Sequence, residues 1–423
     1  MYKLLPTTEL LPHQSRYVEV QLEKKALGCF DAPGLGKSLE ILAAICAVGK
    51  PALVVCPPHL ANNWMAEVSK FTELKVGSEI EICPYTMFSK RVTSLKKYGF
   101  LALDEGHYCK NLEAKRTQAI HSALYDHNPE FLANMTGTPV MNRIPDIYSF
   151  LVMLSYYDHV TPKIIQRYPT SYQFCMRFCN VSEARFGGRS VMQFTGLKNA
   201  EELIAYLKPW TIRRTADQVL KLPSMESQTV TANYKHDPKL EAEWQNFVEG
   251  GSYSPTAKKE SALAKAHFTA EYVKNELESD NGPIVVFTDH PDAAYSIERE
   301  LSGSYRVATI VGGMSIDRRA EYVKQFQKGQ LHAIVLTIGS SSTGITLTKA
   351  STIVFNDICW TPEDLNQARQ RIHRIGQERP TRCVYVVGSS VDDRIIKSVL
   401  SKSKVINTIS KGLGDGNSTD GDD

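Results

Sequence analysis

The sequence lacks the features that mark secreted, metal–thiolate and membrane proteins. None of its nine cysteines forms a C-x-x-C pair, and most of them lie inside apolar runs. We therefore expect reduced thiols in a cytosolic protein, with neither disulfides nor a zinc centre. No apolar run approaches the ~20 residues that a membrane span needs, and the N-terminus has no apolar signal region. The chain is accordingly expected to be soluble, with no membrane partner.

An excess of one charge and internal repeats are also missing. The 423 residues include 49 basic and 46 acidic side chains, a formal net charge of +3. This mild basic balance is compatible with a nucleic-acid partner but does not by itself indicate one. The length predicts about two or three domains, and no repeat of roughly 20–50 residues suggests a solenoid.

What the sequence does contain is a glycine-rich turn between an apolar run and a helical pattern. Residues 31–38 read D-A-P-G-L-G-K-S. Gly34 and Gly36 would let the backbone approach phosphate groups, while Lys37 and Ser38 would contact the phosphates and a Mg²⁺ ion. Asp31 stands where the general phosphate-loop motif has its first glycine. Taken alone, the stretch therefore leaves an ordinary helix start open.

The surrounding chain alternates between short apolar runs and helical patterns. This alternation over residues 1–145, and again over residues 283–387, predicts two α/β lobes with parallel sheets. We expect the first lobe at residues 1–220, with a helical insertion at about 147–212. The second lobe is expected at residues 221–410 and to open with helices. The acidic residues 411–423 have little apolar surface and are expected to be disordered.

Polar groups end two further strands expected in the first lobe. Asp104 and Glu105 follow the apolar run 100–103, and Thr136 and Thr138 follow the run 131–135. Because ligands of parallel sheets bind at the carboxyl ends of the strands, these groups should lie near the phosphate loop. Asp104 could hold Mg²⁺ and Glu105 a water that attacks the γ-phosphate. An acidic loop and a tight turn are the plainer alternatives.

A basic stretch in the second lobe completes the set of candidate residues. The sequence predicts a helix over residues 363–375, and Gln367, Arg371 and Arg374 would lie on one of its faces. Such a face suits a triphosphate, because guanidinium groups offer fixed donors to oxyanions. A solvated basic helix face is the alternative.

Motif by motif, the chain resembles the SWI/SNF-like DNA translocases of helicase superfamily two, with weaker features of the annealing-helicase branch. In that family an acidic residue is also common at the position of Asp31. Departures are Ser38 for the commoner Thr, Gln370 for an acidic residue, and an inter-lobe segment from Arg213 to Pro223 that is one residue short and lacks its usual Lys. The segments that carry the resemblance are 11–14, 34–38, 56–57 with 63–64, 104–107 with 110–111, 136–139, 342–344 with 347–348, and 360–377.

The resemblance implies two RecA-like lobes in tandem, the second of the helicase C-terminal type, which hydrolyse ATP with Mg²⁺ between them. Catalytic roles would belong to Lys37, Asp104, Glu105, Arg371 and Arg374. Nucleotide contacts would come from Gln14, Gly34, Leu35, Gly36, Lys37, Ser38, Gly344 and Gln367, and Mg²⁺ contacts from Ser38 and Asp104. Coupling residues would be His107, Thr136 and Thr138. Nucleic-acid contacts would come from His59, Asn63, Trp64, Tyr85, Gly313, Ser342 and Thr343.

The function expected from these roles is ATP-driven movement along double-stranded or branched DNA. A strand-separating DNA or RNA helicase on the same scaffold remains open, and so does a non-catalytic nucleic-acid-binding protein. Replication or repair proteins are the expected partners of a monomeric chain. Because no added histone-reading or nuclease module is found, this minimal form resembles versions in bacteria and their viruses. We therefore expect a cytoplasmic location in a bacterial or virus-infected bacterial cell.

Overall fold

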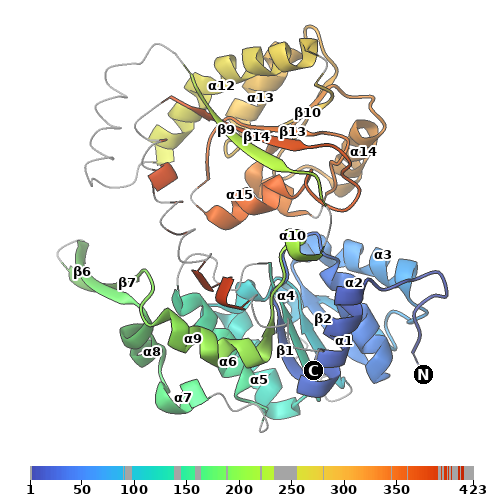
Figure 1. Ribbon diagram of the computed structural model, residues 1–423, viewed down its shortest axis with the longest axis vertical. Helices are drawn as coiled ribbons and strands as arrows, with labels where there is room; N and C mark the ends of the chain where they lie inside the picture. The colour runs from blue at the N-terminus through green and yellow to red at the C-terminus, as the bar shows by residue number, and fades with distance from the viewer. Residues whose placement is uncertain are drawn as a thin grey trace, which may run out of the picture. The chain divides into compact units, whose positions relative to one another are not determined.

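The computed structural model divides into two compact units (Figure 1). The first comprises residues 1–219 and 402–423, and the second comprises residues 220–401. Among the described residues, no helix is both long and apolar enough to span a membrane. The structure describes the chain except residues 1, 89, 91–97, 138–143, 158–162, 187–188, 220–221, 233–254, 280, 344, 360, 389–391, 393–394, 398, 400–401, 403–407, 410 and 414–423.

The first unit is built on a six-stranded parallel sheet. Its inner strands are apolar except for Asn134 on β5, as expected for strands that are buried on both faces. The order is β3-β2-β4-β5-β1-β8, so the strands β4, β5 and β1 are consecutive neighbours. The bounds are β1 (Ala26–Cys29), β2 (Ala52–Cys56), β3 (Ile80–Pro84), β4 (Phe100–Leu103), β5 (Phe131–Met135) and β8 (Thr211–Ile212).

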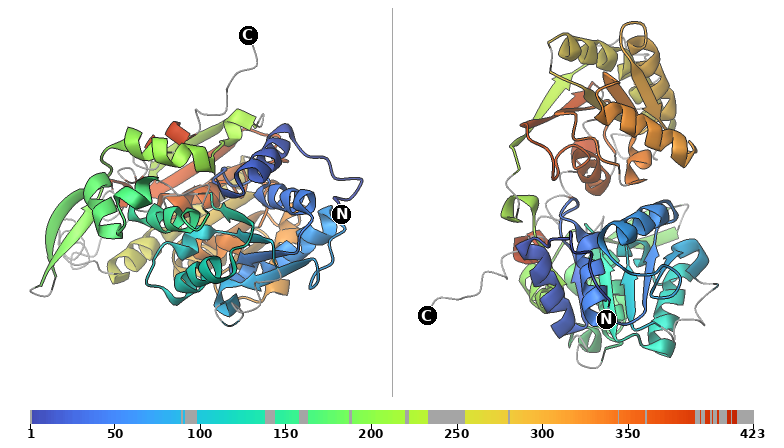
Figure 2. Two further views of the ribbon diagram at one scale, coloured as in Figure 1. Left: turned by 90° about the horizontal axis from the view of Figure 1, so that it is seen from below. Right: turned by 90° about the vertical axis from the view of Figure 1, so that its right-hand side faces the viewer.

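Helices cover both faces of this sheet (Figure 2), because alternate strand residues feed two separate apolar clusters. The helices α1, α2 and α3 pack on one face, and α5, α6, α8 and α9 pack on the other. The bounds are α1 (Pro12–Lys24), α2 (Lys37–Val48), η1 (Pro58–Leu60), α3 (Ala61–Phe71), α4 (Tyr85–Phe88), η3 (Gly106–Cys109), α5 (Lys115–His127), η4 (Ile144–Ile147), α6 (Tyr148–Leu154), α7 (Lys163–Arg167), α8 (Ser171–Phe178), α9 (Ala200–Leu207), η5 (Lys208–Trp210) and α10 (Ala216–Val219).

The insertion that we expected to be helical also contains an antiparallel hairpin. Its strands are β6 (Asn180–Phe186) and β7 (Arg189–Thr195), which pair over their whole length. The segment at 147–212 therefore contains helices, as expected, and in addition a hairpin that we did not predict. Two glycines separate the two strands in the sequence. A two-residue glycine turn between runs of this length is a hairpin signal, so the pattern was present in the sequence.

The second unit repeats the design with another six-stranded parallel sheet, in the order β11-β12-β10-β13-β14-β9. The helices α12 and α13 pack on one face, and α14 and α15 on the other. The prediction of two parallel α/β lobes in tandem with inserted helices is thus confirmed. The bounds are β9 (Met225–Thr231), α12 (Pro255–Glu278), β10 (Ile284–Thr288), α13 (Pro291–Leu301), β11 (Val307–Ile310), α14 (Ile316–Gln327), β12 (Ala333–Thr337), η6 (Ile338–Thr343), β13 (Thr352–Phe355), α15 (Pro362–Arg369) and β14 (Thr381–Val387).

The two ends of the second unit differ from the expectation. It opens with the edge strand β9, and not with a helix, because β9 pairs in parallel with β14 over seven residues. Most side chains of β9 are exposed, so it has no apolar run that would announce a strand. At the other end, Ile409 and Leu413 are buried among the apolar residues of the first unit. Residues 411–413 are helical, and the rest of the expected disordered tail lies outside the described residues.

Candidate active site

The glycine-rich turn forms a loop between β1 and α2, at the carboxyl edge of the first sheet. Gly34 and Gly36 have φ angles of +87° and +84°, in the left-handed region that favours glycine. Gly36 is the N-cap of α2, so the first amides of the helix open onto the loop. Across the turn, Nζ of Lys37 donates to the backbone carbonyl of Asp31 at 2.7 Å. A glycine turn followed by an open helix N-terminus is an arrangement that suits a bound anion.

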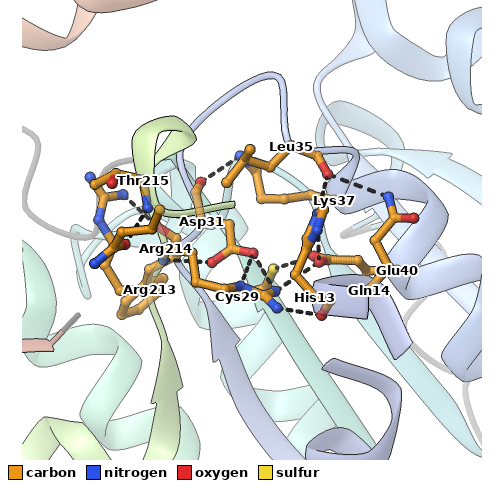
Figure 3. A network of polar contacts seen from close by, with 12 residues as sticks. His13, Gln14, Cys29, Asp31, Leu35, Lys37, Glu40, Arg213, Arg214 and Thr215 are labelled. Carbon is orange, nitrogen blue, oxygen red and sulfur yellow. Dashed lines mark hydrogen bonds and ion pairs between the residues drawn. The ribbon is translucent and has the colours of Figure 1, made fainter. Parts of the chain in front are cut away.

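The start of α1 lies against this loop (Figure 3). Nε2 of Gln14 donates to the carbonyl of Leu35 at 3.4 Å, and Oε1 of Gln14 accepts from the amide of Leu11 at 2.9 Å. A Cβ atom on Gly36 would lie 2.5 Å from Nε2 of Gln14. The left-handed φ of Gly36 favours glycine at this position, and any side chain there would have to displace the Gln14 amide. The predicted nucleotide contact Gln14 is therefore packed onto the loop.

Two carboxylates follow β4, which only β5 separates from β1. Nε1 of Trp64 donates to Oδ2 of Asp104 at 2.7 Å. Burial, and then the neighbouring Glu105, raises the pKa of Asp104 to about 7, while Lys37 acts in the opposite direction. A divalent cation would favour the ionised carboxylate, and Mg²⁺ prefers oxygen ligands of this kind. Asp104 thus fits the predicted Mg²⁺ site.

Two of the predicted nucleic-acid contacts are core residues of the first unit. Trp64 is 1% exposed and Tyr85 is 3% exposed. The indole of Trp64 holds the Asp104 carboxylate, and the hydroxyl of Tyr85 donates to the Asp104 carbonyl at 3.0 Å. Their burial argues against direct contact with a nucleic acid. Both side chains instead fix the end of β4.

The ends of β4 and β5 are joined through a histidine. Nδ1 of His107 lies 3.2 Å from Oγ1 of Thr136 and 3.2 Å from Oε2 of Glu105. Glu105 itself has a φ of +50°, which turns the chain sharply after the buried strand. The structure therefore brings three of the predicted residues together. Thr138, the other predicted coupling residue, lies outside the described residues.

A steric match that the sequence did not reveal lies beneath this turn. A Cβ atom on Gly106 would lie 1.6 Å from Oδ1 of Asn134, which is 3% exposed on β5. On its other side, Nδ2 of Asn134 contacts the sulfur of Met153 on α6 at 3.9 Å. The residue between Glu105 and His107 must therefore be glycine as long as Asn134 occupies this position.

The arginine-rich stretch of the second unit is not the helix that we predicted. The helix α15 ends at Arg369, so Arg371 and Arg374 lie in the turns after it, and the argument from one helix face was wrong. Nε2 of Gln377 donates to the carbonyls of Ala350 and Ile372 at 2.8 and 3.1 Å. These bonds fold the chain back after the helix, which a helical pattern does not reveal. Gln367 lies within α15.

The remaining predicted contacts lie on both units. Asn63 is exposed on α3, and His59 lies in η1 just before it. Gly313 is exposed in a turn after β11 with a φ of +82°. Ser342 and Thr343 belong to η6, and Gly344 lies outside the described residues.

Three charged residues at this site were missed from the sequence as functional groups: Glu40, Arg213 and Arg214. Glu40 and Asp31 are fully buried, and Arg214 bonds to both (Figure 3). One signal was available, because Glu40 is an acidic residue inside an otherwise apolar helix pattern. Its partner could not be identified, since Arg214 lies 174 positions further along the chain.

Comparison with protein families gives two matches. The model of the SNF2-related domain matches residues 73–249, and the model of the helicase conserved C-terminal domain matches residues 265–376. The first match covers part of the first unit and enters the second, and the other match lies within the second unit. The order of the two domains agrees with the order of the motifs along the chain.

Curated relatives extend the match to nearly the whole chain. The mouse protein "DNA annealing helicase and endonuclease ZRANB3" is 25% identical over 93% of this chain and 40% of its own length. A Drosophila melanogaster protein, "SWI/SNF-related matrix-associated actin-dependent regulator of chromatin subfamily A-like protein 1", is 28% identical over 95% of this chain and 56% of its own. The chain therefore spans about half the length of these relatives.

A solved structure is also similar. The "Sulfolobus solfataricus SWI2/SNF2 ATPase core in complex with dsDNA" is 22% identical, and the match covers 96% of this chain and 94% of that one, with a TM-score of 0.40.

Proposed function

We propose that this chain, which belongs to the SWI/SNF-like group of helicase superfamily two, is a DNA-stimulated ATPase that moves along double-stranded DNA. One observation carries the proposal. The phosphate loop, the carboxylate pair and Thr136 end three adjacent strands, β1, β4 and β5, of one parallel sheet. A sheet edge with these groups suits a nucleoside triphosphate.

Each group has a task in phosphoryl transfer to water. The Lys37 ammonium and the first amides of α2 would hold the phosphate oxygens. Ser38 and Asp104 would hold Mg²⁺, which when bound neutralises charge on the phosphates. Glu105 would orient the attacking water and accept its proton. His107, which lies against both Glu105 and Thr136, would transmit the state of this water to the end of β5.

Further nucleotide contacts are proposed outside the loop. Gln14 would read the base, since its amide is already anchored beside the loop at Leu35. Arg371 and Arg374 of the second unit would supply guanidinium groups to the phosphates, a role that the family resemblance supports. Gln367 and Gly344 would complete the nucleotide contacts on the same ground.

Double-stranded or branched DNA is the proposed track. In support, one relative is described as a DNA annealing helicase and endonuclease, and 93% of this chain aligns with 40% of that protein. His59, Asn63, Gly313, Ser342 and Thr343 are the proposed backbone contacts. Contacts to phosphates predict little sequence preference and a strong dependence on salt. A monomeric state, replication or repair partners and a bacterial cytoplasmic location remain proposals from the sequence.

The decisive experiment compares ATP hydrolysis by the purified chain with blunt duplex DNA, branched DNA, single-stranded DNA, RNA and no nucleic acid. Stimulation by duplex DNA, together with displacement of the third strand of a DNA triplex, is the expected result. Stimulation by RNA alone would favour an RNA motor, because RNA recognition uses the 2′-hydroxyl. DNA binding without any hydrolysis would favour the non-catalytic reading and overturn the proposal.

A further inference from the structure

A buried charged cluster lies directly beneath the phosphate loop (Figure 3). The carboxylates of Asp31 and Glu40 are both 0% exposed, and one guanidinium serves them both. Nε of Arg214 donates to Oδ2 of Asp31 at 2.8 Å, and Nη2 donates to the same oxygen and to Oε1 of Glu40, the latter at 2.8 Å. Nη1 of Arg214 donates to the backbone carbonyl of His13. A single side chain thus ties the loop to both α1 and α2.

The backbone around Arg214 runs alongside the entry to the loop. The amide of Phe30 donates to the carbonyl of Ile212 at 2.8 Å, and the amide of Ala32 donates to the carbonyl of Arg214 at 2.9 Å. The amide of Arg214 donates to Oδ1 of Asp31 at 2.8 Å. Residues 211–214, which we name the anchor segment, therefore extend β8 as a partner of β1 up to the loop itself.

The neighbouring arginine extends this attachment to β5. Nη1 of Arg213 donates to the carbonyl of Phe30 and, at 2.6 Å, to the carbonyl of Gly137. Gly137 directly follows Thr136, which contacts His107. The anchor segment thus contacts the chain at the ends of both β1 and β5. In the sequence it stands just before the second unit, which begins at residue 220.

We propose that Arg214 is the positioning residue of the phosphate loop, so that the affinity for ATP depends on how the anchor segment is seated. Arg214 holds the side chain of Asp31. The backbone carbonyl of Asp31 accepts a hydrogen bond from Nζ of Lys37 at 2.7 Å. A shift of the anchor segment would therefore displace the group that orients the phosphate-binding ammonium. This inference rests on the proposed binding of ATP at the loop.

Electrostatics points in the same direction. Without Arg214, the buried Asp31 carboxylate would lose its cation beneath the proposed phosphate site. The pKa of Glu40, which burial and Asp31 already raise to about 8, would rise further. Buried charges that lose their partner are costly, and negative charge beneath the loop would repel the phosphates. Because coupling between two sites is reciprocal, ATP bound at the loop must also stabilise the seated anchor segment.

The test measures binding of a fluorescent ATP analogue, mant-ATP, with Mg²⁺ to the full chain and to its variants. We expect Arg214→Gln to weaken binding at least tenfold and Arg214→Lys to weaken it less, because lysine keeps the charge but loses the forked geometry. The double variant Arg214→Gln/Glu40→Gln should recover part of the loss. Lys259→Met, which removes a half-exposed cation in the second unit, is the control and should bind as tightly as the wild type.

Hydrogen exchange of the wild-type chain gives a second measurement that needs no variant. We expect bound mant-ATP to slow hydrogen exchange at the amides of Ala32 and Arg214. The amide of Ala32 donates to the carbonyl of Arg214, and the amide of Arg214 donates to Oδ1 of Asp31, so both bonds join the loop to the anchor segment. Unchanged exchange, or tight binding by Arg214→Gln, would overturn the inference and leave ATP binding itself intact. A wild-type chain that binds no analogue would instead overturn the proposed function, and the inference with it.

Discussion

The two sheets of this chain share one design but treat the carboxyl ends of their strands differently. In the second unit two acidic groups near this edge pair with lysines from α12. Lys258 pairs with Asp289 after β10, and Lys265 pairs with Asp392 at 2.6 Å with both side chains buried. In the first unit Asp104 receives the neutral indole N–H of Trp64 and lies beside a second carboxylate.

The pKa shifts reflect this difference. Burial raises the pKa of Asp104 to about 7, so its charge is poorly supported in the chain alone. Burial lowers the pKa of Lys258, but Asp289 and Asp357 outweigh it and the pKa is raised. The second edge therefore satisfies its charges internally and contributes stability. At the first edge Asp31 is also paired, with Arg214, but Asp104 has a raised pKa that a bound cation would offset.

The largest expected effect concerns the buried ion pair between Lys265 and Asp392 in the second unit. Lys265→Ala leaves Asp392 buried without its cation, and we expect the free energy of unfolding to fall by about 3–5 kcal/mol. Lys259→Ala on the same helix is the matched control, because both side chains of its pair with Asp292 are about half exposed. That variant should change stability by less than about 0.5 kcal/mol. Both free energies of unfolding are measured by urea denaturation. Equal losses for the two variants would contradict the structural role of the buried pair.

Substitutions at the carboxyl edge of the first sheet should instead affect ATP hydrolysis. Lys37→Ala removes the ammonium that lies across the loop, and we expect DNA-stimulated ATP hydrolysis to fall on the order of 10²–10³-fold. The melting temperature should change little, because Lys37 is only partly buried. Steady-state kinetics and calorimetry on the same preparation measure the two effects. Hydrolysis at the wild-type rate would refute the assignment of the site.

A steric prediction concerns Gly106, in the turn after β4 of the first sheet. Gly106→Ala would place a methyl group into Oδ1 of Asn134 and displace Glu105 and His107. Misplacement of a reacting group by about 1 Å costs roughly 10²-fold in rate, and we expect a loss of that size in kcat.

The double variant Gly106→Ala/Asn134→Ala is the control for this clash. Removing the amide makes room for the methyl group, so kcat should recover most of the way. A double variant as inactive as the single one would show that glycine is needed at position 106 for another reason.

The smallest expected effect is a pH dependence of stability. The folded state holds the proton of Asp104 up to about pH 7, whereas the unfolded state releases it near the ordinary carboxyl pKa. Stability of the metal-free chain should therefore fall as the pH rises from about 4 to about 7. Asp104→Asn removes this contribution, and calorimetry at pH 8 without Mg²⁺ should show a melting temperature about 2–4 °C above the wild type. A melting temperature below that of the wild type would contradict the raised pKa of Asp104 in the folded chain.

Much of the fold could be read from local patterns. The strand β5 was predicted at the residues where it occurs, because a continuous apolar run between turns has few other solutions. The edge strands β8 and β9 were missed, since one is two residues long and the other mostly exposed. The end of α15 was misplaced, because the side-chain amide of Gln377 donates to the carbonyl of Ala350, 27 positions earlier in the chain.

The sequence by itself determined the phosphate loop, because the freedom of Gly34 and Gly36 and the apolar run before them are local properties. It also indicated Asp104, Glu105 and Thr136, as polar residues that end apolar runs. Only the tertiary structure decided which groups support them. Trp64 became the partner of Asp104 and Arg214 became the partner of Asp31, 183 positions away. Such pairs depend on how strands order themselves in a sheet, which no local pattern records.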